Sequence, residues 1–370
     1  MKRPIASAIL CLALALSARA QAPRPPPIHS PVVNPDHTVT FRFRAPDAKK
    51  VELSAQFQKS NQPLVKDDTG VWSITVGPVE PNLYPYNFVV DGVGVADPGN
   101  QDLFPNENFK ASLVDIPGGE PSIYSVQDVP HGELTYGYYQ SRTLSRTRPL
   151  IVYTPPGYRA GTDKYPVLYL VSGTTDTEET WFKVGRANFI LDNLLAQKKA
   201  VPMIIVMPYG NMMNGTPMPS SPEAAKMYQV FSDELVGDII PYVEANYRVS
   251  AGRDRRAIAG FSRGGGQSLF TGFYNLDKFA WIGSYSAYLT PEVFDKYFPG
   301  ASANVDATNR QLKLLWLGVG RSDFLFPQAT AFMDLLKERK LVHQTLITEG
   351  GHTWMNARHY LTDTLQLYFK

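Results

Sequence analysis

The chain has 370 residues, more than one ordinary domain needs, and 44% of them are hydrophobic, as in globular proteins. The formal net charge is +2 and no long basic run occurs, so the charge pattern is not that of a nucleic-acid-binding protein. The single cysteine, Cys11, excludes an internal disulfide and a site built from several thiolates.

Residues 1–20 have the pattern of a secretory signal peptide. Lys2-Arg3 precede an apolar run at residues 5–16, and Ala18-Arg19-Ala20 is typical of a cleavage site. The run is too short to span a bilayer, and no later stretch is long and apolar enough to do so. Cleavage would remove Cys11 and three positive charges, which takes the net charge from +2 to −1 and leaves no thiol. We therefore expect a secreted or periplasmic protein that has no membrane partner after cleavage.

The N-terminal part of the mature chain predicts a linker followed by a small all-β domain. Residues 21–31 contain five prolines, which favour an extended polyproline linker. Residues 32–118 show short alternating runs of β-branched and aromatic residues with no helical period, which predicts a β-sandwich. The expected strands include 38–43, 51–53 and 71–76, and the expected turns are 68–70, 80–82 and 91–92.

Four segments of this all-β domain carry a family pattern: Lys50–Leu53, Asp67–Ser73, Tyr84–Gly92 and Ala96–Asn100. They resemble the family 48 carbohydrate-binding modules, which implies an immunoglobulin-like sandwich and suggests contact with carbohydrate. Aromatic residues on alternating strands are more often core than sugar platform, so we expect Trp72 and Tyr86 in the core. We therefore expect the module to brace its neighbour more than to bind sugar tightly.

From residue 122 to residue 370 the pattern changes to alternating strands and helices. Residues 133–139 and 148–153 look like paired antiparallel strands. Near-continuous apolar strands follow at residues 167–171, 203–207, 257–259, 281–283, 314–317 and 344–347. Apolar residues recur at helical spacing in residues 189–195, 230–247, 332–336 and 361–369. Buried strands that alternate with amphipathic helices predict an α/β fold with a parallel sheet covered on both faces.

The segment Gly260-Phe261-Ser262-Arg263-Gly264 has the G-x-S-x-G pattern of a nucleophile elbow. An apolar strand is expected before Ser262 and a helix of small residues after it, so the serine lies at a strand-to-helix turn. Such a turn holds the hydroxyl clear of the backbone, where a base can reach its proton. The turn also aims the backbone N–H of Arg263 at the position where an oxyanion develops.

A nucleophilic serine needs an imidazole base, and in α/β-hydrolases the order along the chain is serine, acid, histidine. His352 lies in the loop 349–354, directly after an expected strand and therefore at the carboxyl edge of the sheet. His343 lies at the start of that strand and His359 inside the last helix, so both are expected to be packing or surface residues. His352 is the predicted base.

The predicted acid is Asp323, which follows the strand at residues 314–317 and so belongs to the same sheet edge. Asp306 and Asp334 are expected to be solvated surface carboxylates, in a polar loop and in a helix. An oxyanion hole needs a second backbone donor from the loop after an early strand. The predicted donor is the N–H of Thr174.

Segments across residues 133–370 carry a second family pattern: Tyr165–Leu170 with Gly173, Glu179–Trp181, Pro208–Gly210, Glu234–Glu244, Gly260–Gly265 and Gly351-His352. They resemble the esterase-D-type α/β-hydrolases, most closely carbohydrate esterase family 1, which holds feruloyl and acetylxylan esterases. The resemblance implies that Ser262 is the nucleophile, His352 the general base and then acid, and Asp323 the orienting carboxylate.

This sequence departs from the family pattern in two places. It has Ser172-Gly173 where family members often have His-Gly, and it has Arg263 where methionine is common. The cation of Arg263 could favour an anionic or polar acyl group or could point away to an acid. We expect the arginine side chain to point outward.

The expected function is that of a secreted serine esterase that removes a feruloyl or acetyl group from an ester-substituted plant polysaccharide or oligosaccharide. Alternatives are an enterobactin-type siderophore esterase, a mycolyltransferase-like acyltransferase and a non-catalytic glycan-binding protein. The signal peptide disfavours the siderophore esterase, which acts inside the cell, and the complete serine, acid and histidine set disfavours a non-catalytic protein. Ester hydrolysis of this kind needs no metal and no other cofactor.

Overall fold

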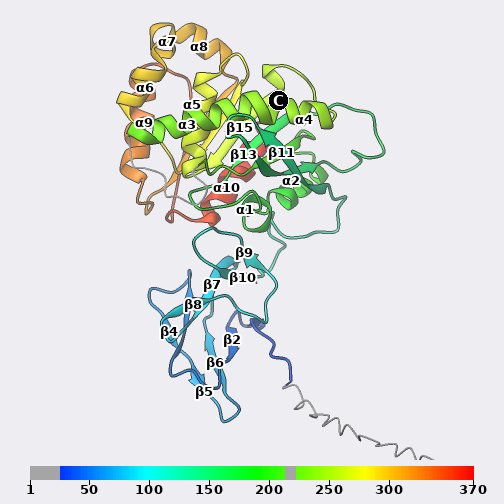
Figure 1. Cartoon of the computed structure of the whole chain (residues 1–370), viewed down its shortest axis with the longest axis vertical. Helices are drawn as coiled ribbons and strands as arrows, with labels where there is room; N and C mark the ends of the chain where they lie inside the picture. Colours follow the sequence, from blue (N-terminus) through cyan, green and yellow to red (C-terminus); the bar gives the residue numbers. More distant parts are fainter. Residues whose placement is uncertain (1–25, 213–221) are drawn as a thin grey trace, which may run out of the picture.

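The computed structural model describes residues 26–212 and 222–370 and divides into two parts (Figure 1). Residues 32–116 form the N-terminal β region, drawn in blue to cyan, and residues 133–365 form the α/β region, drawn in green to red. The expected signal peptide and the first part of the expected linker lie outside the described residues. Within the described ranges, no helix has both the length and the apolar character needed to cross a bilayer.

The N-terminal β region contains two antiparallel sheets. Its strands are β1 (Val32–Val33), β2 (Val39–Arg44), β3 (Val51–Ala55), β4 (Gln62–Pro63), β5 (Val65–Lys66), β6 (Val71–Val76), β7 (Asn82–Val90), β8 (Val93–Val95), β9 (Leu103–Phe104) and β10 (Ala111–Ile116). One sheet has the order β1-β2-β6-β5, and the other has the order β4-β3-β7-β10-β9 with β8 paired to β7. Every second residue of β2 is buried, as the alternating sequence requires.

A single apolar core joins the two sheets of the N-terminal β region. Phe41 from β2 and Tyr86 from β7 meet edge to face, with ring centroids 4.7 Å apart. Trp72 is 8% exposed and Tyr86 is 1% exposed, which confirms the prediction that both are core residues. The Tyr86 hydroxyl donates a hydrogen bond of 2.8 Å to the buried carboxylate of Asp97.

The described end of the expected linker, residues 26–31, lies along strand β2. The hydroxyl of Ser30 accepts a hydrogen bond of 3.0 Å from the backbone N–H of Arg42, and the Arg44 guanidinium donates to the Pro26 carbonyl at 3.3 Å. Ser30 is buried. These bonds hold residues 26–30 against β2, although Pro26, Pro27 and His29 are exposed.

The α/β region is built on one eight-stranded sheet. Its strands are β11 (Glu133–Ser141), β12 (Arg146–Thr154), β13 (Val167–Val171), β14 (Ile204–Pro208), β15 (Arg256–Phe261), β16 (Trp281–Tyr285), β17 (Leu314–Gly320) and β18 (Gln344–Thr348). The order is β11-β12-β14-β13-β15-β16-β17-β18. The six strands β13 to β18 run parallel to one another. The pairs β11·β12 and β12·β14 are antiparallel. The expected antiparallel pair and the parallel sheet are both confirmed.

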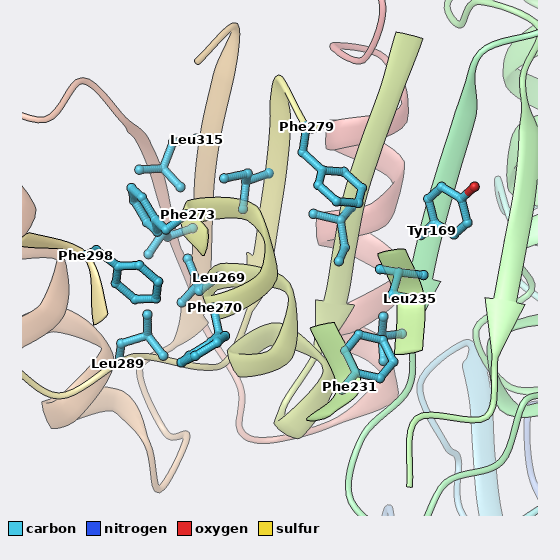
Figure 2. Packing of buried hydrophobic residues seen from close by; sticks show 14 of the residues in the cluster. Tyr169, Phe231, Leu235, Leu269, Phe270, Phe273, Phe279, Leu289, Phe298 and Leu315 are labelled. Carbon is cyan, nitrogen blue, oxygen red and sulfur yellow. The ribbon is translucent and has the colours of Figure 1, made fainter. Parts of the chain in front are cut away.

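Helices cover both faces of this sheet, which explains why its inner strands are apolar throughout. The helices are α1 (Thr180–Lys183), α2 (Ala187–Ala196), α3 (Pro222–Glu234), α4 (Ile240–Asn246), α5 (Arg263–Tyr274), α6 (Pro291–Tyr297), α7 (Pro299–Ala303), α8 (Val305–Gln311), α9 (Phe326–Glu338) and α10 (Trp354–Leu365). Tyr169 and Leu168 are neighbours on β13 but belong to different apolar clusters, one on each face. Figure 2 shows the first cluster, where Phe270 and Phe273 of α5 pack beside Phe298.

The helix expected over residues 230–247 is interrupted. Between α3 and α4 the chain makes a π-helical turn, Leu235–Ile239, that the sequence pattern does not predict. Pro241 has no N–H and so leaves the carbonyl of Gly237 without its helical donor. The guanidinium of Arg142 donates to that carbonyl instead. The proline and its replacement donor account for the local widening of the helix.

The N-terminal β region and the α/β region share an apolar core. Leu83, Phe104, Ala111 and Leu113 of the β region belong to the same buried cluster as residues of α1, α2 and α10. The buried guanidinium of Arg358 on α10 donates to the Leu83 carbonyl at 3.3 Å and to the Asn82 side chain. A shared apolar core holds two parts of a chain together more firmly than a polar contact does.

Candidate active site

Ser262 lies at the carboxyl edge of the sheet, where β15 ends and α5 begins. Its backbone has φ 57° and ψ −123°, a conformation that side-chain-bearing residues rarely adopt. The flanking glycines make this turn possible, because a Cβ at Gly260 would lie 2.4 Å from the backbone of Gly264 and one at Gly264 would lie 2.2 Å from the Val171 carbonyl. The strand, turn and helix expected around Ser262 are therefore present.

His352 and Asp323 meet at the same edge of the sheet. The Nδ1 atom of His352 lies 2.9 Å from Oδ2 and 3.0 Å from Oδ1 of Asp323. Asp323 follows β17, and His352 follows β18. The His352 ring stacks on Phe261, the neighbour of Ser262, with ring centroids 4.7 Å apart. The structure thus brings the predicted base and acid together beside the predicted nucleophile.

The Asp323 carboxyl is buried, which by itself opposes ionisation. The hydrogen bond from His352 and the backbone N–H of Leu325, 2.8 Å away, outweigh this effect and hold the pKa of Asp323 below its usual value. An ionised Asp323 accepts a hydrogen bond from the N–H at Nδ1 of His352, which leaves Nε2 as the nitrogen that can accept a proton. In the described residues no hydrogen bond joins His352 to Ser262, a contact that often tightens only with substrate bound.

The two predicted oxyanion donors belong to different segments, the start of α5 and the loop after β13. Arg263 is the first residue of α5, so its N–H has no partner within the helix. Thr174 lies in the loop after β13, and the preceding Gly173 packs so closely that a Cβ there would lie 3.5 Å from the Ser262 Cβ. The N–H of Gly173 donates to Asp176 Oδ2 at 3.1 Å, which engages that amide within the loop.

The outward orientation expected for the Arg263 side chain is wrong. Arg263 is 5% exposed and lies among Asp176, Glu107 and two tyrosine hydroxyls. Burial lowers the pKa of its guanidinium, and the charges of Asp176 and Glu107 oppose that shift. The arginine is therefore a buried cation near two carboxylates, and its Nε and Nη2 atoms have no hydrogen-bond partner in the part of the chain that the structure describes.

Several residues near the site have no strong sequence signal. Glu107, from the N-terminal β region, accepts a hydrogen bond from the Tyr209 hydroxyl. Asn211 Nδ2 donates to both Glu107 carboxylate oxygens, Oε1 at 2.8 Å and Oε2 at 2.7 Å. Asn106 donates to Asp176 Oδ1 at 3.2 Å. Only Tyr209 falls in a segment that the family resemblance marks. The other residues could not be assigned from the sequence, because their place near the site depends on contacts between distant parts of the chain.

The sheet, the helices on its two faces and the serine turn at its carboxyl edge define an α/β-hydrolase fold. The Esterase family model matches residues 141–366, more than half of the chain, and the chain belongs to that family. The family match identifies the α/β region, residues 141–366, as an esterase. Among the described residues, no group of three or more His, Cys, Asp or Glu side chains is placed to hold a metal ion.

One curated relative and two solved structures illustrate the similarity. An endo-1,4-β-xylanase/feruloyl esterase of Xylanibacter ruminicola is 28% identical over 351 residues, which make up 92% of this chain and 46% of the relative. This chain thus spans less than half the length of that relative. A carbohydrate esterase family 1 ferulic acid esterase of Anaeromyces mucronatus matches with a TM-score of 0.58 and 22% identity, over 68% of this chain and 96% of its own. The enterobactin esterase of Shigella flexneri matches with a TM-score of 0.63 and 18% identity, over 89% of this chain and 92% of its own.

Proposed function

We propose that this esterase hydrolyses feruloyl or other hydroxycinnamoyl esters, or acetyl esters, on xylan-type plant polysaccharides. The observation that carries the proposal is the similarity to a xylanase/feruloyl esterase over 92% of the chain, which includes the N-terminal β region. Among these acyl groups we favour the feruloyl group, because the name of that relative includes feruloyl esterase. The proposed nucleophile is Ser262, the proposed base is His352 and the proposed orienting acid is Asp323.

The proposed reaction begins with acylation of the serine. His352 Nε2 takes the proton of the Ser262 hydroxyl while the serine oxygen attacks the ester carbonyl carbon. The negative charge that develops on the carbonyl oxygen is stabilised by the backbone N–H groups of Arg263 and Thr174. The bond to the sugar oxygen then breaks, and the sugar hydroxyl leaves with the proton from His352. The acyl group remains attached to Ser262 as an ester.

Deacylation repeats these steps with water. His352 removes a proton from a water molecule, the water oxygen attacks the acyl carbon, and the proton returns to the Ser262 oxygen as the carboxylic acid leaves. Throughout both steps Asp323 stabilises the imidazolium form of His352 through the contact at Nδ1. The net reaction converts one ester and one water into one acid and one alcohol.

We further propose that residues 32–118 form an immunoglobulin-like sandwich of the family 48 carbohydrate-binding type, joined to an esterase domain at residues 122–370. The two antiparallel sheets with one core support the sandwich. The buried apolar contact with α1, α2 and α10 supports a bracing role for this domain. Residues 1–20 would direct the protein out of the cytoplasm as a cleaved signal peptide, which suits a polymeric plant substrate.

A siderophore esterase is the second candidate, because the similarity to the enterobactin esterase covers 89% of this chain. An acyltransferase would use the same acyl-enzyme but pass the acyl group to a sugar hydroxyl. The experiment that separates these functions measures turnover of methyl ferulate, 4-nitrophenyl acetate, acetylated xylan and enterobactin, with Ser262→Ala as the inactive control. Preferred turnover of methyl ferulate supports the proposal, whereas preferred turnover of enterobactin contradicts it.

A further inference from the structure

The chain between β9 and β10 of the N-terminal β region reaches across to the loop that follows β13. The Glu107 backbone N–H donates to the Thr175 carbonyl at 2.8 Å, and Asn106 Nδ2 donates to the Thr175 hydroxyl at 3.0 Å. The Thr180 hydroxyl donates to the Pro105 carbonyl at 3.0 Å. Residues 105–107 therefore hold the β13 loop through backbone and side-chain contacts.

Thr175 is held in an unfavourable backbone conformation. Its φ is 63°, in the left-handed region, where a β-branched side chain is strained. A conformation of this kind persists only where the surroundings impose it, and such residues cluster at functional sites. Both contacts to Thr175 described above come from the N-terminal β region. This region thus helps to fix the direction of the peptide group next to Thr174.

A second connection runs through the buried carboxylate of Asp176. Its Oδ1 accepts the hydrogen bond from Asn106, and its Oδ2 accepts the N–H of Gly173, which lies against Ser262. One carboxylate thus links a residue of the β region to the backbone beside the nucleophile. Glu107 adds a further contact between the two regions, because its carboxylate binds the side chains of Tyr209 and Asn211 just after β14.

We propose that Asn106 and Glu107 are positioning residues of the esterase, which set the geometry of the oxyanion loop at Gly173 and Thr174 from the neighbouring β region. This inference rests on the proposed function, because it assigns the Thr174 N–H to the oxyanion. Oxyanion donors act only if they point at the charge that forms in the transition state. The N-terminal β region then contributes to the rate of the chemical step as well as to stability.

The test compares Asn106→Ala with Asn82→Ala. Both asparagines belong to the β region and contact the α/β region, but Asn82 binds Arg358 on α10 rather than the oxyanion loop. For each variant, kcat and KM are measured on methyl ferulate and 4-nitrophenyl acetate, together with Tm. Affinity for phenylboronic acid, which forms a tetrahedral adduct with a reactive serine, reports the oxyanion geometry directly.

We expect Asn106→Ala to lower kcat about tenfold or more, with KM nearly unchanged, because the lost interaction acts in the transition state. Affinity for phenylboronic acid should fall by a similar factor. Asn82→Ala should keep wild-type kcat, whatever its effect on Tm. If Asn106→Ala keeps wild-type kcat and boronate affinity while Ser262→Ala is inactive, the positioning role is wrong and the proposed function stands.

A swapped pair distinguishes positioning from general damage. Asn106→Asp alone places two carboxylates together and should lower kcat more than Asn106→Ala does. In the double variant Asn106→Asp/Asp176→Asn, the new asparagine can donate to residue 106 and still accept the Gly173 N–H. Recovery of most of the lost kcat in the double variant supports the proposal, and a double variant no better than Asn106→Asp contradicts it. If Ser262→Ala itself stays active, the proposed function fails first and the inference fails with it.

Discussion

The Nδ1 atom of His352 is shared between the two oxygens of Asp323, at 2.9 and 3.0 Å. This contact joins the ends of two adjacent parallel strands, β17 and β18, and involves a carboxylate whose side chain is completely buried. A buried acceptor fixes which nitrogen of His352 carries the proton and how the ring is oriented. The remaining nitrogen, Nε2, is thereby prepared to accept a proton from a hydroxyl.

The first prediction concerns Asp323. The Asp323→Asn variant should lower kcat by roughly three to four orders of magnitude, because an amide can hold the imidazole in the wrong tautomer. The measurement is kcat on methyl ferulate at neutral pH. Asp306→Asn is a matched control, since Asp306 is an exposed carboxylate on α8. Equal kcat values for the two variants would remove Asp323 from the mechanism.

The second prediction concerns the pH dependence of stability. Burial raises the pKa of Asp176 to about 7; Glu107 acts in the same direction, while Arg263 and the hydrogen bonds from Asn106 and Gly173 act against it. Between about pH 4 and pH 7 the folded protein therefore keeps a proton that the unfolded chain has released. The free energy of unfolding of the wild type should fall across this range relative to that of Asp176→Asn, and the difference should level off above pH 7.

Urea unfolding of both proteins at pH 5, 6, 7 and 8 measures this effect. Asp306→Asn should follow the wild-type pH dependence, since it leaves Asp176 in place. A constant difference between the wild type and Asp176→Asn over the whole range would contradict the raised pKa.

The third prediction concerns the shared core of the two regions. Leu113→Ala should lower the free energy of unfolding by about 2–5 kcal/mol, because Leu113 is buried in the cluster that includes α1, α2 and α10. Leu103→Ala is the matched control, since the Leu103 side chain on the neighbouring strand β9 is exposed. Similar unfolding midpoints in denaturant for the two variants would show that the β region does not brace the esterase.

The fourth prediction concerns metal ions. EDTA should leave turnover of methyl ferulate unchanged, because the proposed mechanism activates both the serine and the water through His352. Dialysed enzyme with and without added zinc provides the comparison. Loss of activity in EDTA and its recovery with zinc would indicate a different kind of hydrolase.

Much of the α/β region could be predicted because its sequence signals are local. The strand at 167–171 is apolar throughout since both of its faces are covered, and the glycines around Ser262 are required by the turn itself. Asp323 and His352 could be assigned because each follows a strand of a parallel sheet, and such strands end at one edge. These patterns need no knowledge of distant residues.

Other features depend on contacts between distant parts of the chain. Arg263 is buried near Asp176 and Glu107, which come from separate segments of the chain. Helix α10 begins at Trp354, ahead of the apolar period at residues 361–369, and its first turns bury polar side chains that bind backbone groups. Asn356, for example, donates to the Gly351 carbonyl at 3.0 Å. Hydrophobic periodicity does not detect a helix stabilised in this way.

The most direct test of the proposed mechanism is the turnover of methyl ferulate by Ser262→Ala. The variant removes only the hydroxyl, and alanine at this turn must adopt the same positive φ as the serine. We expect kcat to fall by several orders of magnitude while circular dichroism and Tm show a folded protein. A folded Ser262→Ala protein that hydrolyses methyl ferulate at a rate close to the wild type would contradict the assignment of Ser262 as the nucleophile.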